Sequence, residues 1–315
     1  MVTDTAAAPF PVSRFLGPRY WINWMGVGLL WLAVQLPYAW QLALGRGMGR
    51  IMRQLAKFRG RGDTARVNID LCFPELSERE REELVKKHYE SLGIGVFEVA
   101  MGWWAPNERL APLVAEIEGM EHLQEALKQG KGVILMGAHF TTLEIGARLL
   151  NMYVPFHVVY KHFKNPLFDT IMRRGRERHV KKAIHRNDIR NMLKSLKQNM
   201  PVWYAADMNY RGKHAVFAPF FGIMASTNPA TSRLARSSGA PVVPFFQERL
   251  PDARGYRLVI KPPVENFPSD SAEDDTQRLN AIIEEQVRRV PEQYFWVHRR
   301  FKTRPPGEPK LYQRR

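Results

Sequence analysis

Short apolar segments alternate with amphipathic helical segments along residues 131–260, and this alternation limits the fold more than any other feature. The apolar runs have the length of buried strands and lie at residues 132–137, 157–160, 202–206, 241–246 and 256–260. Helical periodicity is typical of the segments between most of them, at residues 141–150, 165–179, 188–198 and 229–237. Strands that alternate with helices favour a parallel sheet. We therefore expect an α/β fold, with a mostly parallel central sheet covered by helices.

Two longer helices are expected on either side of this alternation. The sequence from Ser77 to Glu80 fits a capping box and predicts a helix that continues to about Trp104. Near the other end, residues 269–276 read as an acidic loop, and residues 277–289 as a final helix.

Composition places the chain among ordinary globular proteins. Of its 315 residues, 45% are hydrophobic and 25% are charged, which excludes wholesale disorder, a collagen and a polytopic membrane bundle. The single cysteine, Cys72, excludes an intrachain disulfide framework and a CxxC zinc site, and we expect it to be a small core residue. Because no cluster of His, Cys, Asp or Glu has ligand spacing, we expect neither a metal nor a cofactor.

The N-terminal region indicates contact with a membrane. Residues 20–45 contain no charged side chain, although Pro37 interrupts the apolar run and leaves it borderline for a spanning helix. Basic residues flank both ends, and four tryptophans suit a headgroup interface: Trp21, Trp24, Trp31 and Trp40. We expect a leader and membrane-anchor helix over residues 1–45, which dips into or spans the inner membrane, and an α/β domain over residues 46–315 on its cytoplasmic side. A buried helix of a soluble protein is the alternative reading, and a cleaved signal peptide fits poorly.

His139 and Glu144 form the candidate catalytic pair. His139 follows an apolar strand, and ligands of α/β sheets bind beyond the carboxyl ends of strands. A carboxylate on one imidazole nitrogen would leave the other nitrogen able to take a proton from an alcohol. No nucleophile elbow is present, so direct attack by a substrate hydroxyl is the simpler chemistry. A structural role is the alternative, because residues 141–144 also fit a capping box in which Glu144 binds only a backbone amide.

Several segments resemble known acyltransferases. Residues 137–144 resemble the H-x4-D/E motif of lysophospholipid-type acyltransferases. Residues 68–78, the opening block 18–21 and above all the C-terminal run 291–305 resemble the bacterial lipid A late acyltransferases. The resemblance implies transfer of a fatty acyl chain from acyl carrier protein to a hydroxyl of a Kdo-bearing lipid A precursor, a secondary acylation of lauroyl type. It assigns the general base to His139 and the orienting carboxylate to Glu144.

The resemblance also implies substrate-binding positions. It maps Lys161, Asn165, Asp207 and Tyr210 to the substrate face, with Lys161 in place of an arginine that the family often has. Asp207 follows the strand at residues 202–206, where it could shape the acceptor site or cap the loop. Three arginines are candidates for substrate phosphates, because guanidinium forks suit them: Arg233, Arg299 and Arg300.

The chain is strongly basic, with a formal net charge of +16. Such an excess favours an anionic partner, and residues 173–197, with ten Lys and Arg, are a candidate dock for acyl carrier protein or for an anionic membrane surface. A solvated helix face is the alternative. Nothing resembles a nucleic-acid-binding motif, so we expect no nucleic acid partner. Two other functions stay open, a glycerolipid acyltransferase and a non-catalytic lipid-binding protein of the same fold.

Overall fold

The computed structural model describes residues 11–58 and 64–312. Its helices are α1 (Trp21–Val34), α2 (Tyr38–Phe58), α3 (Thr64–Cys72), α4 (Glu78–Trp104), α5 (Asn107–Leu110), α6 (Met120–Lys128), α7 (Leu143–Leu150), α8 (Pro166–Glu177), α9 (Ile189–Lys197), α10 (Ala230–Ser238) and α11 (Ala272–Arg289). Its strands are β1 (Val114–Glu118), β2 (Ile134–Gly137), β3 (His157–Tyr160), β4 (Lys182–His185), β5 (Val202–Ala205), β6 (Val216–Phe220), β7 (Ile223–Thr227), β8 (Val242–Arg249) and β9 (Tyr256–Ile260).

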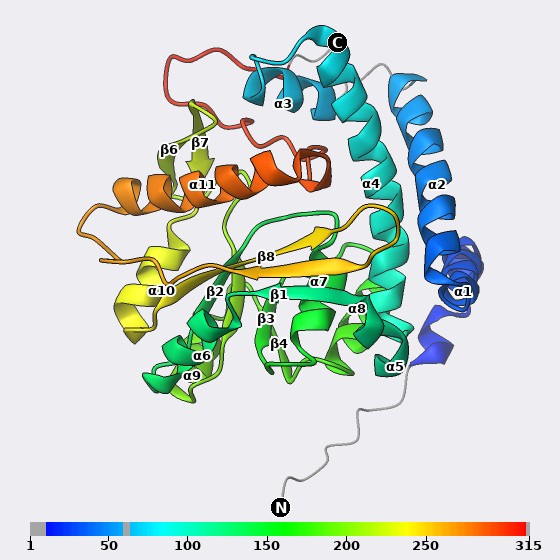
Figure 1. Cartoon of the computed structure of the whole chain (residues 1–315), viewed down its shortest axis with the longest axis horizontal. Helices are drawn as coiled ribbons and strands as arrows, with labels where there is room; N and C mark the ends of the chain where they lie inside the picture. The colour runs from blue at the N-terminus through cyan, green and yellow to red at the C-terminus, as the bar shows by residue number, and fades with distance from the viewer. Residues whose placement is uncertain (1–10, 59–63, 313–315) are drawn as a thin grey trace, which may run out of the picture.

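A mostly parallel sheet forms the centre of the molecule, as predicted (Figure 1). Within the described residues its seven strands have the order β1-β9-β8-β2-β5-β3-β4. The block from β8 to β4 is parallel, whereas β9 pairs antiparallel with β8. The five expected strands are present, while β1, β4 and the separate hairpin β6–β7 were not anticipated.

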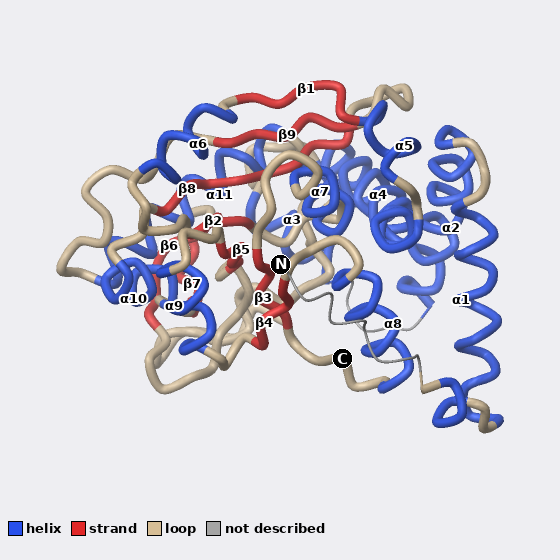
Figure 2. Tube along the Cα trace, turned by 90° about the horizontal axis from the view of Figure 1, so that it is seen from below, coloured by secondary structure: helices blue, strands red, loops and turns tan. Residues whose placement is uncertain are grey.

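Successive residues of the central strands enter two different cores. In β2, Ile134 and Met136 pack in a cluster with α9, α10 and α11, while Leu135 packs in a second cluster with α6 and α7. A strand buried on both faces reads as a continuous apolar run, which is why residues 132–137 carry no polar side chain. Figure 2 shows the strands of the sheet side by side, from β1 at one edge to β4 at the other.

Helix α4 connects the sheet to the N-terminal helices. The predicted capping box is present, because the Ser77 hydroxyl accepts the Glu80 amide and the Glu80 carboxylate accepts the Ser77 amide. Helices α2 and α4 approach so closely that a Cβ on Gly49 would lie 2.1 Å from the Tyr89 carbonyl oxygen. The boundary predicted at residue 45 therefore lies inside α2, which is packed on the α/β domain (Figure 2). The two glycines of the next segment, Gly60 and Gly62, predict a break in the helical structure there, and this position lies outside the described residues.

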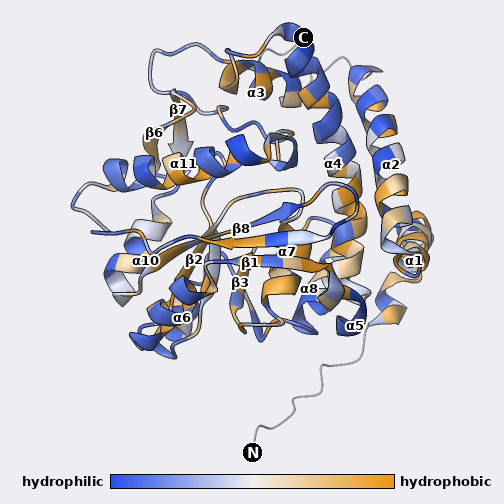
Figure 3. Cartoon of the chain, viewed as in Figure 1, coloured by the Kyte–Doolittle hydropathy of each residue, from blue (hydrophilic) through white to orange (hydrophobic). Residues whose placement is uncertain are grey.

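Helix α1 is short and apolar on its exposed side (Figure 3). Its exposed side chains are mostly large and hydrophobic: Trp21, Ile22, Met25, Leu29, Trp31 and Leu32. Among the described residues, no helix combines the length and the apolar character needed to cross a bilayer. The expected N-terminal anchor is therefore not confirmed, and the alternative of a buried helix does not fit these exposed side chains.

The last helix begins earlier than predicted. The acidic segment read as a loop belongs largely to α11, which starts at Ala272. The hydroxyl of Ser271 accepts the amide of Asp274 and caps the helix, and acidic residues in the first turn interact favourably with the helix dipole. Acidic residues that stabilise the start of a helix thus resemble an acidic loop in the sequence.

A buried ion pair between α4 and the end of β8 should contribute measurably to stability. The carboxylate of Glu98 on α4 accepts a hydrogen bond from the guanidinium of Arg249 at 2.8 Å, and both side chains are almost inaccessible to solvent. Replacing Glu98 by Ala leaves a buried, unpaired guanidinium, so we expect a loss of about 3–5 kcal/mol in the free energy of unfolding. Glu125→Ala removes an exposed pair with Lys128 and should cost about 0–1 kcal/mol. Denaturant titration measures both, and equal losses would contradict the prediction.

Candidate active site

The register of two neighbouring strands brings His139 and Asp207 together. β2 and β5 are parallel, and Gly137 pairs with Ala205 at their carboxyl ends. His139 and Asp207 each lie two residues beyond that pair, so both reach the same point on the carboxyl edge of the sheet. This is the edge at which α/β proteins bind their ligands.

The two side chains form a close, oriented contact. Nδ1 of His139 lies 2.6 Å from Oδ1 of Asp207, and the His139 backbone amide donates to Oδ2 at 2.9 Å. Tyr294 donates its hydroxyl to the same Oδ2 at 3.1 Å. The Asp207 side chain is 1% exposed, whereas that of His139 is 31% exposed. Because the Asp207 carboxylate accepts a hydrogen bond from the proton on Nδ1, Nε2 of His139 is the nitrogen left to act as a base, and no described residue hydrogen-bonds to Nε2.

Electrostatics reinforce this arrangement. Burial raises the pKa of Asp207, but the charge and hydrogen bonds of His139 outweigh burial and lower that pKa to about 2. Burial lowers the pKa of His139 and the charge of Arg176 lowers it further, but Asp207 outweighs both and raises it. Asp207 is thus a carboxylate that stabilises an imidazolium, as a partner of a general base should.

The C-terminal run wraps around the loop that carries His139. The backbone carbonyl of Gln293 accepts a hydrogen bond from the Thr141 amide at 2.7 Å, and the backbone amide of Phe295 donates one to the His139 carbonyl at 2.9 Å. Tyr294, between them, forms a bridge with Phe140 and reaches Asp207. The long C-terminal match noted in the sequence is therefore part of the site itself.

Glu144 occupies a different position from the one predicted. Its carboxylate accepts two hydrogen bonds of 2.8 Å, one from Nε of Arg176 and one from the indole Nε1 of Trp103. The predicted contact in which Glu144 orients His139 is not formed, because Asp207 holds Nδ1 and Arg176 holds Glu144. The capping alternative is not found either, since the start of α7 has no side-chain cap.

Arg176 is the residue that sequence reasoning missed. It lay among the ten basic residues read as a docking face, yet it projects from α8 toward the catalytic edge and its charge acts on His139. Tyr294 was missed as well, because its role depends on a contact between residues 87 positions apart. Strand register could have indicated the His139–Asp207 pair, since both follow strands predicted to lie in one parallel sheet.

The other predicted substrate residues are dispersed. Asn165 caps α8 by accepting the amides of Leu167 and Phe168, which gives it a structural role. Lys161 is exposed just beyond the carboxyl end of β3. Tyr210 is half-buried beside the hairpin, and Arg233 is exposed on α10.

The two C-terminal arginines differ in accessibility. Arg300 is 2% exposed and donates to the Ser226 carbonyl and the Thr227 hydroxyl. The prediction that Arg300 binds a substrate phosphate is therefore wrong, because its guanidinium is buried behind the site. Arg299 is partly exposed and lies over the ring of Tyr312.

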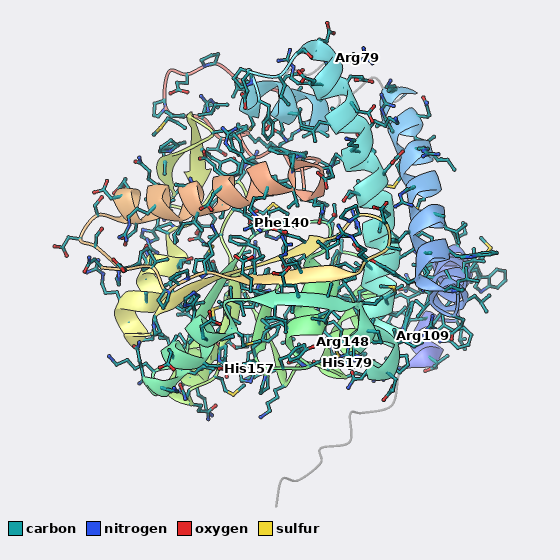
Figure 4. The ribbon with its side chains drawn as sticks, viewed as in Figure 1. Arg79, Arg109, Phe140, Arg148, His157 and His179 are labelled. Carbon is teal, nitrogen blue, oxygen red and sulfur yellow. The ribbon has the colours of Figure 1, made fainter. Side chains whose placement is uncertain are left out.

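A small cavity adjoins the Glu144–Arg176 pair. Its volume is about 40 Å³, and its walls are largely apolar: Leu143, Ala147, Val158, Val159, Val180 and Trp203. Arg148 and His179 also line it and lie together in Figure 4, apart from Phe140. Among the described residues no group of three His, Cys, Asp or Glu side chains could hold a metal ion.

Known proteins match nearly the whole chain. The family model for bacterial lipid A biosynthesis acyltransferases matches residues 12–303. The lipid A biosynthesis lauroyltransferase of Escherichia coli K12 is 44% identical over 95% of this chain and 97% of its own. The palmitoleoyltransferase of the same strain is 41% identical with the same coverage.

A solved structure gives a weaker likeness. The 1-acyl-sn-glycerophosphate acyltransferase of Thermotoga maritima covers 84% of this chain and 97% of its own, at 15% identity and a TM-score of 0.38, which adds nothing to the assignment. The family resemblance read from the sequence is confirmed by the family model and the two relatives. The chain belongs to the bacterial lipid A biosynthesis acyltransferase family, and it is an acyltransferase of lipid A biosynthesis.

Proposed function

We propose that this enzyme transfers a fatty acyl chain, of lauroyl type, from acyl carrier protein to a hydroxyl group of a Kdo-bearing lipid A precursor. The observation that carries the mechanism is the geometry of His139, with Nδ1 on a buried carboxylate and Nε2 directed away from it. A lauroyl donor is supported by the 44% identical Escherichia coli relative, which is named as a lauroyltransferase.

His139 acts first as a base and then as an acid. Nε2 takes the proton of the acceptor hydroxyl while the hydroxyl oxygen attacks the thioester carbonyl carbon. The tetrahedral intermediate then collapses, the carbon–sulfur bond breaks, and the thiolate takes the proton back from Nε2. The products are an ester and a free thiol, and no acyl-enzyme forms. Asp207 stays ionised throughout and stabilises the imidazolium.

Arg176 is suited to stabilise the negative charge of the intermediate. Glu144 holds the guanidinium by two nitrogens, which fixes its orientation. Because the charge of Arg176 acts on His139, its field also acts on the oxyanion that forms beside Nε2. Glu144 would thus serve catalysis through Arg176, as a positioning residue.

The apolar cavity beside this pair is a candidate for the start of the acyl-chain site. Its volume of about 40 Å³ holds only a few carbon atoms, so a longer chain needs movement of α7 or α8. The two relatives are named for different acyl chains, so the side chains that close this cavity would decide the preference.

Acyl carrier protein would dock on the basic carboxyl edge of the sheet. Lys161 and Lys164 follow β3, Arg186 follows β4, and Arg211 and Lys213 follow β5. All five are exposed, and no carboxylate of a described residue pairs with them. An acidic carrier drawn to these loops would present its thioester near His139.

We also propose that α1 lies in the cytoplasmic face of the inner membrane rather than spanning it. Its 14 residues extend about 21 Å, less than the roughly 30 Å of a hydrocarbon core. The exposed apolar face of α1 can sink into the interface, while Arg46 and Arg50 of α2 meet anionic headgroups.

The central test is acyl transfer by the purified full chain. With lauroyl-loaded acyl carrier protein and a Kdo-bearing tetra-acyl acceptor, the wild type should add one chain. His139→Ala should lose at least about a hundredfold in rate, the range expected of a general base. An active His139→Ala would refute the assigned base. If the wild type transfers no acyl chain to this acceptor from any donor, but does transfer one to glycerolipid acceptors, the proposed acceptor is wrong.

Tyr294→Phe tests the pairing through its pH profile. Loss of the hydroxyl leaves the Asp207 carboxylate less stabilised, so it binds the imidazolium more tightly and the pKa of His139 rises. Because His139 must be neutral to act as a base, the acidic limb of kcat/KM should shift by some tenths of a unit to higher pH. Plateau activity should fall only a few-fold. Arg176 and Arg300 stay in place in this variant, so an unchanged limb would show that Tyr294 only packs.

If α1 inserts into the membrane, negative charges placed on its apolar face should release the protein from membranes. Wild type should remain with inner membranes after a high-salt wash, because salt screens charges but does not weaken apolar insertion. Met25→Asp with Leu29→Asp, at 63% and 60% exposure, should shift the protein to the soluble fraction. Ile189→Asp, the control, alters an exposed apolar residue of α9 and should leave the protein in the membrane fraction. Release of the wild type by salt alone would refute apolar insertion.

A further inference from the structure

A groove of about 450 Å³ lies on the far side of α8 from the catalytic edge. It is formed by α1, the end of α4 and α8, with Val12 at one end. Its volume is within the range of roughly 300–1,000 Å³ that is typical of small-molecule sites. Neither the catalytic pair nor the cavity beside Glu144 contributes to it.

The walls of the groove are suited to hydrocarbon. Trp24 and Trp31 of α1 face Trp104 of α4 and Ile171 of α8, and Val27 completes the apolar lining. Gly28 opens the groove further, because no atom lies within 4 Å of the position that its Cβ would occupy. Tryptophans combine an apolar body with a polar N–H and are typical of the boundary between acyl chains and headgroups.

Two arginines give the groove a charged end. Arg174 of α8 and Arg178, the residue that caps its C-terminal end, are one helical turn apart, and both line the groove. Arg178 is exposed and has no carboxylate partner among the described residues. Arg176 lies roughly 200° around the helix from both, which is why it meets Glu144 on the other side. One face of α8 therefore belongs to the catalytic site and the other to the groove.

The apolar walls and the two neighbouring guanidinium groups together indicate which kind of ligand the groove can bind. An acyl chain fits the walls, and a phosphate suits two arginine forks. The exposed apolar face of α1 continues from the groove, so a lipid could enter sideways from a bilayer. We propose that the groove binds one acyl chain of an anionic membrane phospholipid, with its phosphate on Arg178 and within the positive field of Arg174. The proposal rests on the membrane location proposed above.

Gly28→Leu tests the apolar part of the site. The new side chain fills the groove, whereas Gly26→Leu on the same helix meets equally open space without lining it. Phosphatidylglycerol titrated into the detergent-purified full chain should bind to the wild type and Gly26→Leu at one molecule per chain, counted by native mass spectrometry. Gly28→Leu should bind at least about tenfold more weakly. Equal binding by the two variants would overturn the proposal.

The charged part is tested by neutralising both arginines. Arg174→Gln with Arg178→Gln should erase the preference for phosphatidylglycerol over phosphatidylcholine, by roughly tenfold in affinity. Arg190→Gln with Lys194→Gln removes the same charge, with the same spacing, from exposed positions on α9 and should keep the preference. If both pairs act alike, only net charge matters and the site is refuted.

The readout separates this proposal from the proposed function. Lipid counting needs no acyl transfer, so a chain that binds phosphatidylglycerol in the groove but transfers no acyl group would refute only the function. A chain that transfers acyl groups but binds no phosphatidylglycerol would refute only the groove.

Discussion

The contact between His139 and Asp207 depends on the pairing of β2 with β5. Both residues lie two positions beyond paired strand ends, so a shift of one residue in this register would separate them. The strands hold this register because both are buried on two faces, with Leu135 in one core and Met136 in the other. Packing on the two sides of the sheet is thus what places the base against its carboxylate.

The C-terminal run completes this arrangement from outside the sheet. Its backbone pairs with the His139 loop on both sides of Tyr294, and buried Arg300 ties the same run to β7 through Ser226 and Thr227. A buried guanidinium with neutral partners is costly unless it is well hydrogen-bonded. Its position behind Asp207 offsets part of that cost, since its positive charge lowers the pKa of Asp207. The C-terminal run that matches the family thus includes residues that contact the His139 loop and a buried arginine that a substrate phosphate cannot reach.

Much of the fold could be predicted from the sequence because the central strands and their helices have strong periodicity. The strands that were missed have weak patterns: β1 is exposed at a sheet edge, β4 contains Lys182 and His185, and Pro219 interrupts β6. At the site, His139 was identified from its place after a strand. Its partner was not, since a carboxylate five residues away in sequence was more conspicuous than Asp207, which is 68 residues away.

Helix α8 links the enzymatic and the membrane-facing parts of the molecule. Its inner face carries Arg176, which is fixed by Glu144, and its outer face carries Arg174 and Arg178 beside α1. Gly175 lies between these faces, and a Cβ there would come within 2.5 Å of the Trp103 ring, whose Nε1 also binds Glu144. A movement of α8 caused by a lipid in the groove would therefore shift Arg176 directly, because Arg176 belongs to this helix, and would press on Trp103, which binds Glu144. Lipid occupancy and oxyanion stabilisation would then be coupled through the position of α8 itself.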